Sequence, residues 1–132
     1  MKSIRFVGLD VDDAGINIAV LENDRPKPII EKRIPATPEK LLRELERVRS
    51  RGAVDLRVCY EAGPCGYEIY RELRAKGIDC VVVAPGLVPR RAADRVKTNR
   101  RDAEKLARRL RTGERDAIHV PTEETEALRD LL

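Results

Sequence analysis

The sequence has no apolar run near the roughly 18 residues that a membrane-spanning helix needs. A short strand-like segment follows Met1 directly, so we expect no signal peptide. We therefore expect a soluble, cytoplasmic protein with no membrane partner. The 132 residues fit one domain with one modest core.

Cysteine and histidine are scarce. The three cysteines, Cys59, Cys65 and Cys80, are odd in number and have no C-x-x-C spacing, which favours reduced, partly buried thiols over metal ligands or disulfides. The single histidine, His119, lies in a short extended segment with no acid beside it in sequence. A surface position is therefore a better interpretation of His119 than a catalytic role.

Positive charge is concentrated in one part of the chain. The net charge is only +4, but residues 90–115 hold eleven Lys or Arg against four Asp or Glu, which gives that segment +7. Such a segment suits a phosphate backbone, because each neutralised phosphate releases counterions. A solvated helix face without a partner explains the charge equally well.

The apolar pattern changes period along the chain. Three strands are expected first, at residues 4–11, 16–21 and 28–34, joined by short links rich in turn-forming residues. Helices and strands then alternate. The expected elements are a helix from Thr37 to the stop at Gly52, a strand at 56–61, a helix at 67–76, a strand at 80–84 and a helix from about 100 to 110.

This order of elements predicts an α/β protein with a ribonuclease-H-like (RuvC-like) mixed sheet. Three antiparallel strands are extended by parallel strands, with helices on both faces. A doubly wound parallel sheet is the alternative, but the first two strands are too close together for a helical crossover. We expect the domain to span residues 1–121. Residues 122–132 open a last helix without a stop signal, which we expect to lead into a further region.

Three acidic residues stand beside apolar patterns. Asp10 interrupts the first strand near its end, and Glu61 closes the fourth strand, where ligand crevices form in open sheets. Asp102 precedes Leu106 of an apolar helical stripe by one turn, with Asn99 on the same side. If they converge, these side chains offer the oxygen ligands that Mg²⁺ or Mn²⁺ takes. Helix caps and ordinary ion pairs are the alternative in a chain with 38% charged residues.

Three ordered blocks resemble the N-terminal DEDD transposase domain of insertion-sequence recombinases, the group guided by a bridge RNA. They are Phe-Val-Gly-Leu-Asp-Val at 6–11, Glu-Ala-Gly-Pro-Cys-Gly-Tyr-Glu at 61–68 with Val-Val-Val-Ala-Pro at 81–85, and Val-Lys-Thr-Asn-Arg-Arg-Asp-Ala at 96–103. The resemblance implies a RuvC-like fold, a four-carboxylate site for Mg²⁺, and DNA cleavage and rejoining.

Carried over by position, the family's catalytic and metal-binding acids fall on Asp10, Glu61 and Asp102. The fourth position falls on Asn99, where the family usually has Asp. An Asn keeps a carbonyl ligand but removes one negative charge, so we expect weaker metal affinity. The basic residues that flank the proposed metal site, Lys97, Arg100, Arg101 and Lys105, are our candidates for contacts with nucleic-acid phosphates.

The chain also departs from the family pattern after the first strand. Asp12 and Asp13 stand where a small hydroxyl residue and a Lys are common, and a role for either acid at the metal is open. The family's full proteins carry a C-terminal domain with a nucleophilic Ser, which this sequence lacks. The resemblance therefore implies DNA, guide RNA, that missing domain and further copies of the chain as partners.

We thus predict an Mg-dependent transposase or recombinase domain that is incomplete alone. Two alternatives share its fold: a non-catalytic or truncated nucleic-acid-binding module, and a Holliday-junction-resolvase-like nuclease. A nucleotide-binding protein of the sugar-kinase and actin type is less favoured. Its phosphate turn needs backbone donors, whereas residues 12–15 form a short acidic turn.

Overall fold

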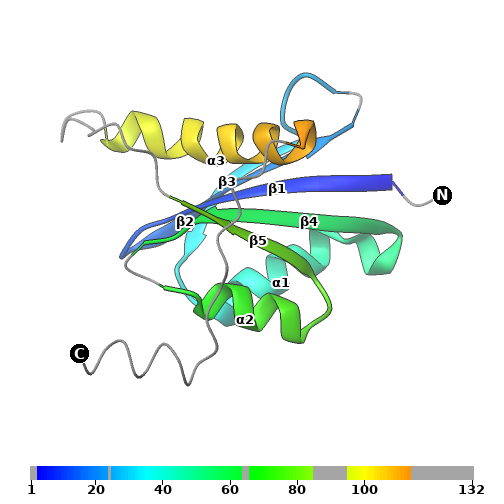
Figure 1. Ribbon diagram of the computed structural model, residues 1–132, viewed down its shortest axis with the longest axis horizontal. Helices are drawn as coiled ribbons and strands as arrows, with labels where there is room; N and C mark the ends of the chain where they lie inside the picture. Colours follow the sequence, from blue (N-terminus) through cyan, green and yellow to red (C-terminus); the bar gives the residue numbers. More distant parts are fainter. Residues whose placement is uncertain (1–2, 24, 64–65, 85–94, 114–132) are drawn as a thin grey trace.

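One five-stranded mixed sheet forms the centre of the molecule, with the strand order β3-β2-β1-β4-β5 (Figure 1). The computed structural model describes residues 3–23, 25–63, 66–84 and 95–113, without the side chains of residues 51 and 95–101. The elements are β1 (Ser3–Val11), β2 (Gly15–Glu22), β3 (Ile30–Pro35), α1 (Pro38–Val48), a 3-10 turn (Ser50–Gly52), β4 (Val54–Glu61), α2 (Glu68–Ala75), β5 (Asp79–Val83) and α3 (Arg95–Thr112).

The strand directions confirm the predicted fold class. β1 pairs antiparallel with β2, and β2 pairs antiparallel with β3. On the other side of β1, β4 and then β5 add in parallel. Helices cover both faces: α1 and α2 lie on one, and α3 lies on the other (Figure 1). This is the ribonuclease-H-like arrangement.

The β1–β2 turn sets the register of the sheet. The Asp12 Oδ1 atom accepts hydrogen bonds from the backbone N–H groups of Ala14 and Gly15, at 2.9 and 2.8 Å. Asp side chains favour such turns because they satisfy the backbone locally. The pairing that follows places Asp10 opposite Asn17.

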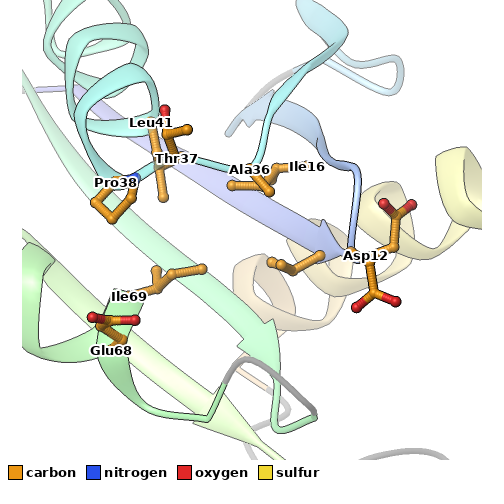
Figure 2. Close-up of a pocket in the computed structure, with 10 residues that line it drawn as sticks. Asp12, Ile16, Ala36, Thr37, Pro38, Leu41, Glu68 and Ile69 are labelled. Carbon is orange, nitrogen blue, oxygen red and sulfur yellow. The ribbon is translucent and has the colours of Figure 1, made fainter.

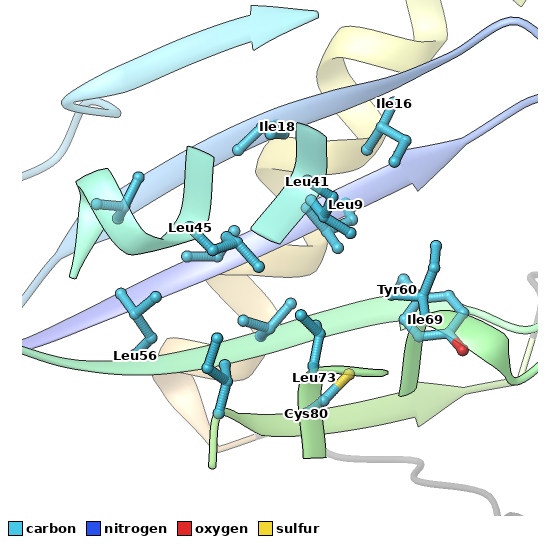
Figure 3. Close-up of a cluster of buried hydrophobic side chains, with 14 of the residues drawn as sticks. Leu9, Ile16, Ile18, Leu41, Leu45, Leu56, Tyr60, Ile69, Leu73 and Cys80 are labelled. Atoms are coloured by element: carbon cyan, nitrogen blue, oxygen red, sulfur yellow. The ribbon is translucent and has the colours of Figure 1, made fainter. Parts of the chain in front are cut away.

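The face under α1 and α2 holds the larger apolar core (Figure 3). α1 begins as predicted: the Thr37 hydroxyl accepts a hydrogen bond from the Lys40 N–H at 3.3 Å, and Pro38 stands in the first turn. Leu41 and Leu45 of α1 are fully buried against the sheet. Among the described residues, most of the apolar burial, and hence of the hydrophobic stabilisation, lies on this face.

The face under α3 is narrower and its helix lies closer to the sheet. Its apolar cluster consists of Phe6, Leu21, Cys59, Val83, Leu106, Ala107 and Leu110. A Cβ atom at Gly8 would lie only 1.9 Å from the carbonyl oxygen of Ala103. Glycine at this strand position therefore allows the backbone of α3 to rest directly on β1.

The beginning of α3 differs from the sequence prediction. α3 begins at Arg95, five residues before the predicted start, because residues 95–99 contain no Gly or Pro that would end a helix.

Cys59 and Cys80 are buried free thiols, as predicted, and burial raises the pKa of Cys80. Cys65, His119 and residues 122–132 lie outside the described residues. Within the described ranges, no helix is long and apolar enough to cross a membrane.

Candidate functional site

Asp10 and Glu61 lie on neighbouring parallel strands. The β1–β4 register pairs Gly8 with Cys59 and Leu9 with Tyr60, so its continuation brings Asp10 beside Glu61. Adjacent strands are about 4.8 Å apart. Side chains alternate between faces, and Phe6 and Cys59 of the same parity belong to the α3 cluster. Both carboxylates, each half-buried, therefore share the α3 face at one end of the sheet.

α3 brings Asp102 to the same end. Its C-terminal half lies over the start of β1, because the Arg111 guanidinium donates to the carbonyl of Glu22, whose strand partner is Arg5. Its middle lies over Gly8, so its N-terminal half extends toward the end of β1 (Figure 1). Asp102 directly precedes Ala103, and only 9% of it is exposed. The three predicted acids thus come from three elements to one region.

The carboxylates are not gathered into a finished ligand set. In the part of the chain that the structure describes, no group of three or more His, Cys, Asp or Glu side chains is arranged to hold a metal ion. The donor chemistry nevertheless fits, because carboxylate oxygens are the ligands that Mg²⁺ and Mn²⁺ prefer. The metal centre therefore stays a prediction.

The structure adds a residue that the sequence analysis missed. Asn17 is buried, with an exposed fraction of 8%. It lies on β2 directly opposite Asp10 of β1. Its amide carries both donors and an acceptor beside the Asp10 carboxylate. The sequence could have identified Asn17, because an antiparallel turn at residues 12–15 places positions 10 and 17 opposite each other.

Arg33 completes the polar row across β1, β2 and β3. It is the β3 partner of Asn17, and its guanidinium donates to Asp12 Oδ1 at 2.8 Å. This hydrogen bond, opposed by burial and assisted by the N–H groups of Ala14 and Gly15, lowers the pKa of Asp12 to about 2. The Asp12 carboxylate, and more weakly that of Asp10, raises the pKa of Arg33.

These contacts bear on whether Asp12 or Asp13, the two acids after β1, has a role at the metal. Asp12 is engaged by its own turn and by Arg33, so its carboxylate serves the hairpin. Asp13 is exposed. On α3, Glu104 pairs with Arg108 at 2.7 Å.

The predicted phosphate-binding residues all belong to α3. Lys105 is exposed, three residues after Asp102, as predicted. The side chains of Lys97, Asn99, Arg100 and Arg101 lie outside the described part of the structure, so their predicted roles stay predictions.

A pocket of about 240 Å³ opens on the opposite face, under α1 and α2 (Figure 2). Its apolar floor is part of the larger core, and acids stand at its rim. The lining residues are Val11, Asp12, Asp13, Ile16, Ala36, Thr37, Pro38, Leu41, Glu68 and Ile69. The predicted acids face α3 and do not line this pocket.

The strand order and the strand directions define a ribonuclease-H-like domain. A family model described as a transposase matches residues 7–132 of the chain. The chain belongs to this family, the DEDD transposases of IS110-type insertion elements.

Two relatives agree with this assignment. A transposase of Sinorhizobium fredii, y4qE, is 45% identical over 128 residues, covering 96% of this chain and 33% of the relative. The transposase for insertion sequence element IS1533 of Leptospira borgpetersenii is 37% identical over 134 residues, covering 100% of this chain and 38% of the relative. The chain spans about a third of the length of these relatives.

A solved structure is also similar. The large terminase nuclease from the thermophilic phage G20c superposes with a TM-score of 0.48 at 19% identity, covering 85% of this chain and 56% of that one.

Proposed function

We propose that this chain is the metal-dependent, carboxylate-bearing domain of a DNA transposase, active in phosphoryl transfer on DNA. The observation that carries the proposal is the β1–β4 register, which brings Asp10 beside Glu61 on the face where Asp102 is buried. The family assignment and the names of the relatives support a transposase over a Holliday-junction-resolvase-like nuclease.

In this proposal Asp10, Glu61 and Asp102 hold Mg²⁺ or Mn²⁺. A bound ion of this kind lowers the pKa of a coordinated water and offsets the charge of a phosphate under attack. Asn17 lies where its amide can hydrogen-bond and orient the Asp10 carboxylate. Asn99 replaces the usual fourth acid, so the site carries one negative charge less and binds the ion more weakly.

The full activity of a transposase would need more than this chain, which spans about a third of the length of its relatives. From the resemblance we propose a cytoplasmic protein that works on DNA with a guide RNA, with a Ser-bearing C-terminal domain and with further copies of itself. Strand exchange would need those parts, whereas metal binding and contact with phosphates would reside in this chain.

Titration calorimetry with Mn²⁺ and Mg²⁺ tests the proposal. We expect a saturable site in the wild-type chain that Asp10→Ala abolishes. The matched control is Asp55→Ala, because Asp55 is an exposed acid near the beginning of β4, at the other end of the sheet. Equal binding by wild type and Asp10→Ala would contradict the proposal.

A second function keeps support from two observations. Within the described residues the acids are not arranged as a metal site, and Asn99 stands where an acid is usual. Both favour a nucleic-acid-binding module without catalysis. Such a module would bind DNA equally well with EDTA or Mn²⁺ and would show no saturable metal site.

A further inference from the structure

The loop between β2 and β3 is fastened to the C-terminal half of α3. The Arg111 Nη1 atom donates to the carbonyl oxygens of Glu22 and Arg25, each at 2.9 Å. Arg108 donates to the carbonyl oxygen of Pro26. Figure 1 shows this loop beside the end of the helix. Segments more than 80 residues apart in sequence are thereby held as one surface.

The fastening leaves basic side chains on the outside. Lys27 and Lys105 are exposed and form no ion pair within the described ranges. The side chain of Arg25 is 69% exposed, and its ion pair with Glu22 is long, at 3.7 Å. Arg109 is exposed one helical turn after Lys105. We name these four residues, Arg25, Lys27, Lys105 and Arg109, the loop–helix patch.

Few described acids oppose this charge. Glu104 is bound by Arg108 at 2.7 Å, and Glu22 is shared between Arg5 and Arg25. Asp24, in the same loop, lies outside the described residues. Among the described residues, the patch and the two arginines that hold the loop therefore carry more positive than negative charge, which makes the surface complementary to a polyanion.

We propose that the loop–helix patch extends the phosphate contact predicted at Lys105 onto the loop between β2 and β3, and that it holds the phosphate backbone of the strand that continues away from the acidic end of the sheet. This inference rests on the proposed function for the identity of its ligand. α3 rises about 1.5 Å per residue, so Arg109 lies about 10 Å along the helix from Asp102. That separation corresponds to about three nucleotides, since one strand of a duplex carries a phosphate every ~3.4 Å along its axis.

The fastening explains why this surface is more than a solvated helix face. Arg108 and Arg111 direct their guanidinium groups at backbone carbonyls of the loop. They thus order the loop before any ligand arrives, and less conformational entropy is lost when phosphates bind. A loop without this tether would carry the same charge but bind a backbone less well.

Fluorescence anisotropy over a series of salt concentrations, in EDTA, tests the patch with a duplex DNA and a single-stranded RNA as probes. The test variant is Arg25→Ala with Lys27→Ala. The control is Lys40→Ala with Arg43→Ala, two exposed basic residues of α1 on the opposite face. Circular dichroism and urea unfolding check that both variants fold.

Two lost phosphate contacts should lower the slope of log K against log salt by about 1.8 on duplex DNA and about 1.4 on the single strand. The control should keep the wild-type slope. Equal slope changes in both variants, no change in either, or no nucleic-acid binding by the wild type would overturn the inference.

Manganese titration separates this inference from the proposed function. The loop variant should bind Mn²⁺ as the wild type does. A reduced slope in a chain that binds no metal would support the patch and contradict the metal-dependent activity. If the chain binds Mn²⁺ but the loop variant keeps the wild-type slope, the result would contradict the patch and support the metal-dependent activity.

Discussion

The two faces of the sheet are built differently. The face under α1 and α2 is filled by large apolar side chains, among them Leu9, Leu45 and Tyr60 (Figure 3). The face under α3 packs through small residues, Gly8 and Ala103, and becomes polar toward the end of β1. One face thus supplies most of the apolar burial, and the other brings acids from three elements together. Changes to the two faces should separate stability from ligand binding.

The largest effect on stability is expected on the α1/α2 face. Leu45 is fully buried, so Leu45→Ala removes a large side chain and leaves a cavity. We expect the free energy of unfolding in urea to fall by about 2–5 kcal/mol. The folded fraction should still bind Mn²⁺ with the wild-type affinity. A loss of metal affinity in folded protein would show that the two faces are not independent.

Gly8→Ala, on the α3 face, should lower both the stability of the fold and the affinity for Mn²⁺. Its new Cβ would meet the Ala103 carbonyl oxygen at 1.9 Å and the Ala107 nitrogen at 2.7 Å, so α3 must move away from β1. We expect a loss of about 1–3 kcal/mol of stability, as for other overpacked sites. Because α3 carries Asp102, we also expect weaker Mn²⁺ binding.

Gly63→Ala is the matched control for this substitution, since a Cβ there has no neighbour within 4 Å. It should change neither quantity appreciably. Wild-type Mn²⁺ affinity in Gly8→Ala would mean that the close approach of α3 is unimportant for the site.

The smallest effect is expected at the hairpin beside the acids, where Asp12→Asn keeps an oxygen acceptor for the turn but removes the charge. The folded-state pKa of Asp12, about 2, lies below its ordinary value of 3.8. Its ion pair with Arg33 therefore stabilises the fold fully above about pH 4, and this contribution is lost as the pH falls toward 2. The side chain is 36% exposed, so the contribution is below about 1 kcal/mol.

Urea unfolding of wild type and Asp12→Asn at several pH values measures this difference. The two curves should differ near pH 7 and converge as the pH falls to about 2. A difference that stays constant with pH would show that the ion pair with Arg33 adds nothing to stability.

The sequence was sufficient for the architecture. Short turns after β1 and β2 require an antiparallel meander, and the apolar residues 80–83 of β5 suit a buried parallel strand. The beginning of α3 was not predicted, because the apolar stripe of Ala103 and Leu106 becomes regular only later in the helix.

The immediate surroundings of the acids were harder to predict than the acids themselves. Asp10 is conspicuous because it breaks an apolar strand, whereas Asn17 and Arg33 gain their meaning only from pairing across β2 and β3. Sequence spacing also gives no distances between side chains. It left open whether the acids converge, and it could not predict that they are not assembled as a metal site in the described structure.

The central claim is that Asp10, Glu61 and Asp102 share a divalent cation. Anomalous diffraction from crystals of this chain soaked in Mn²⁺ addresses it most directly. The account predicts a peak on the α3 face at the end of β1, bounded by carboxylate oxygens of these three residues and missing in Asp10→Ala crystals. A manganese peak elsewhere, with these carboxylates left unliganded at saturating Mn²⁺, would contradict it.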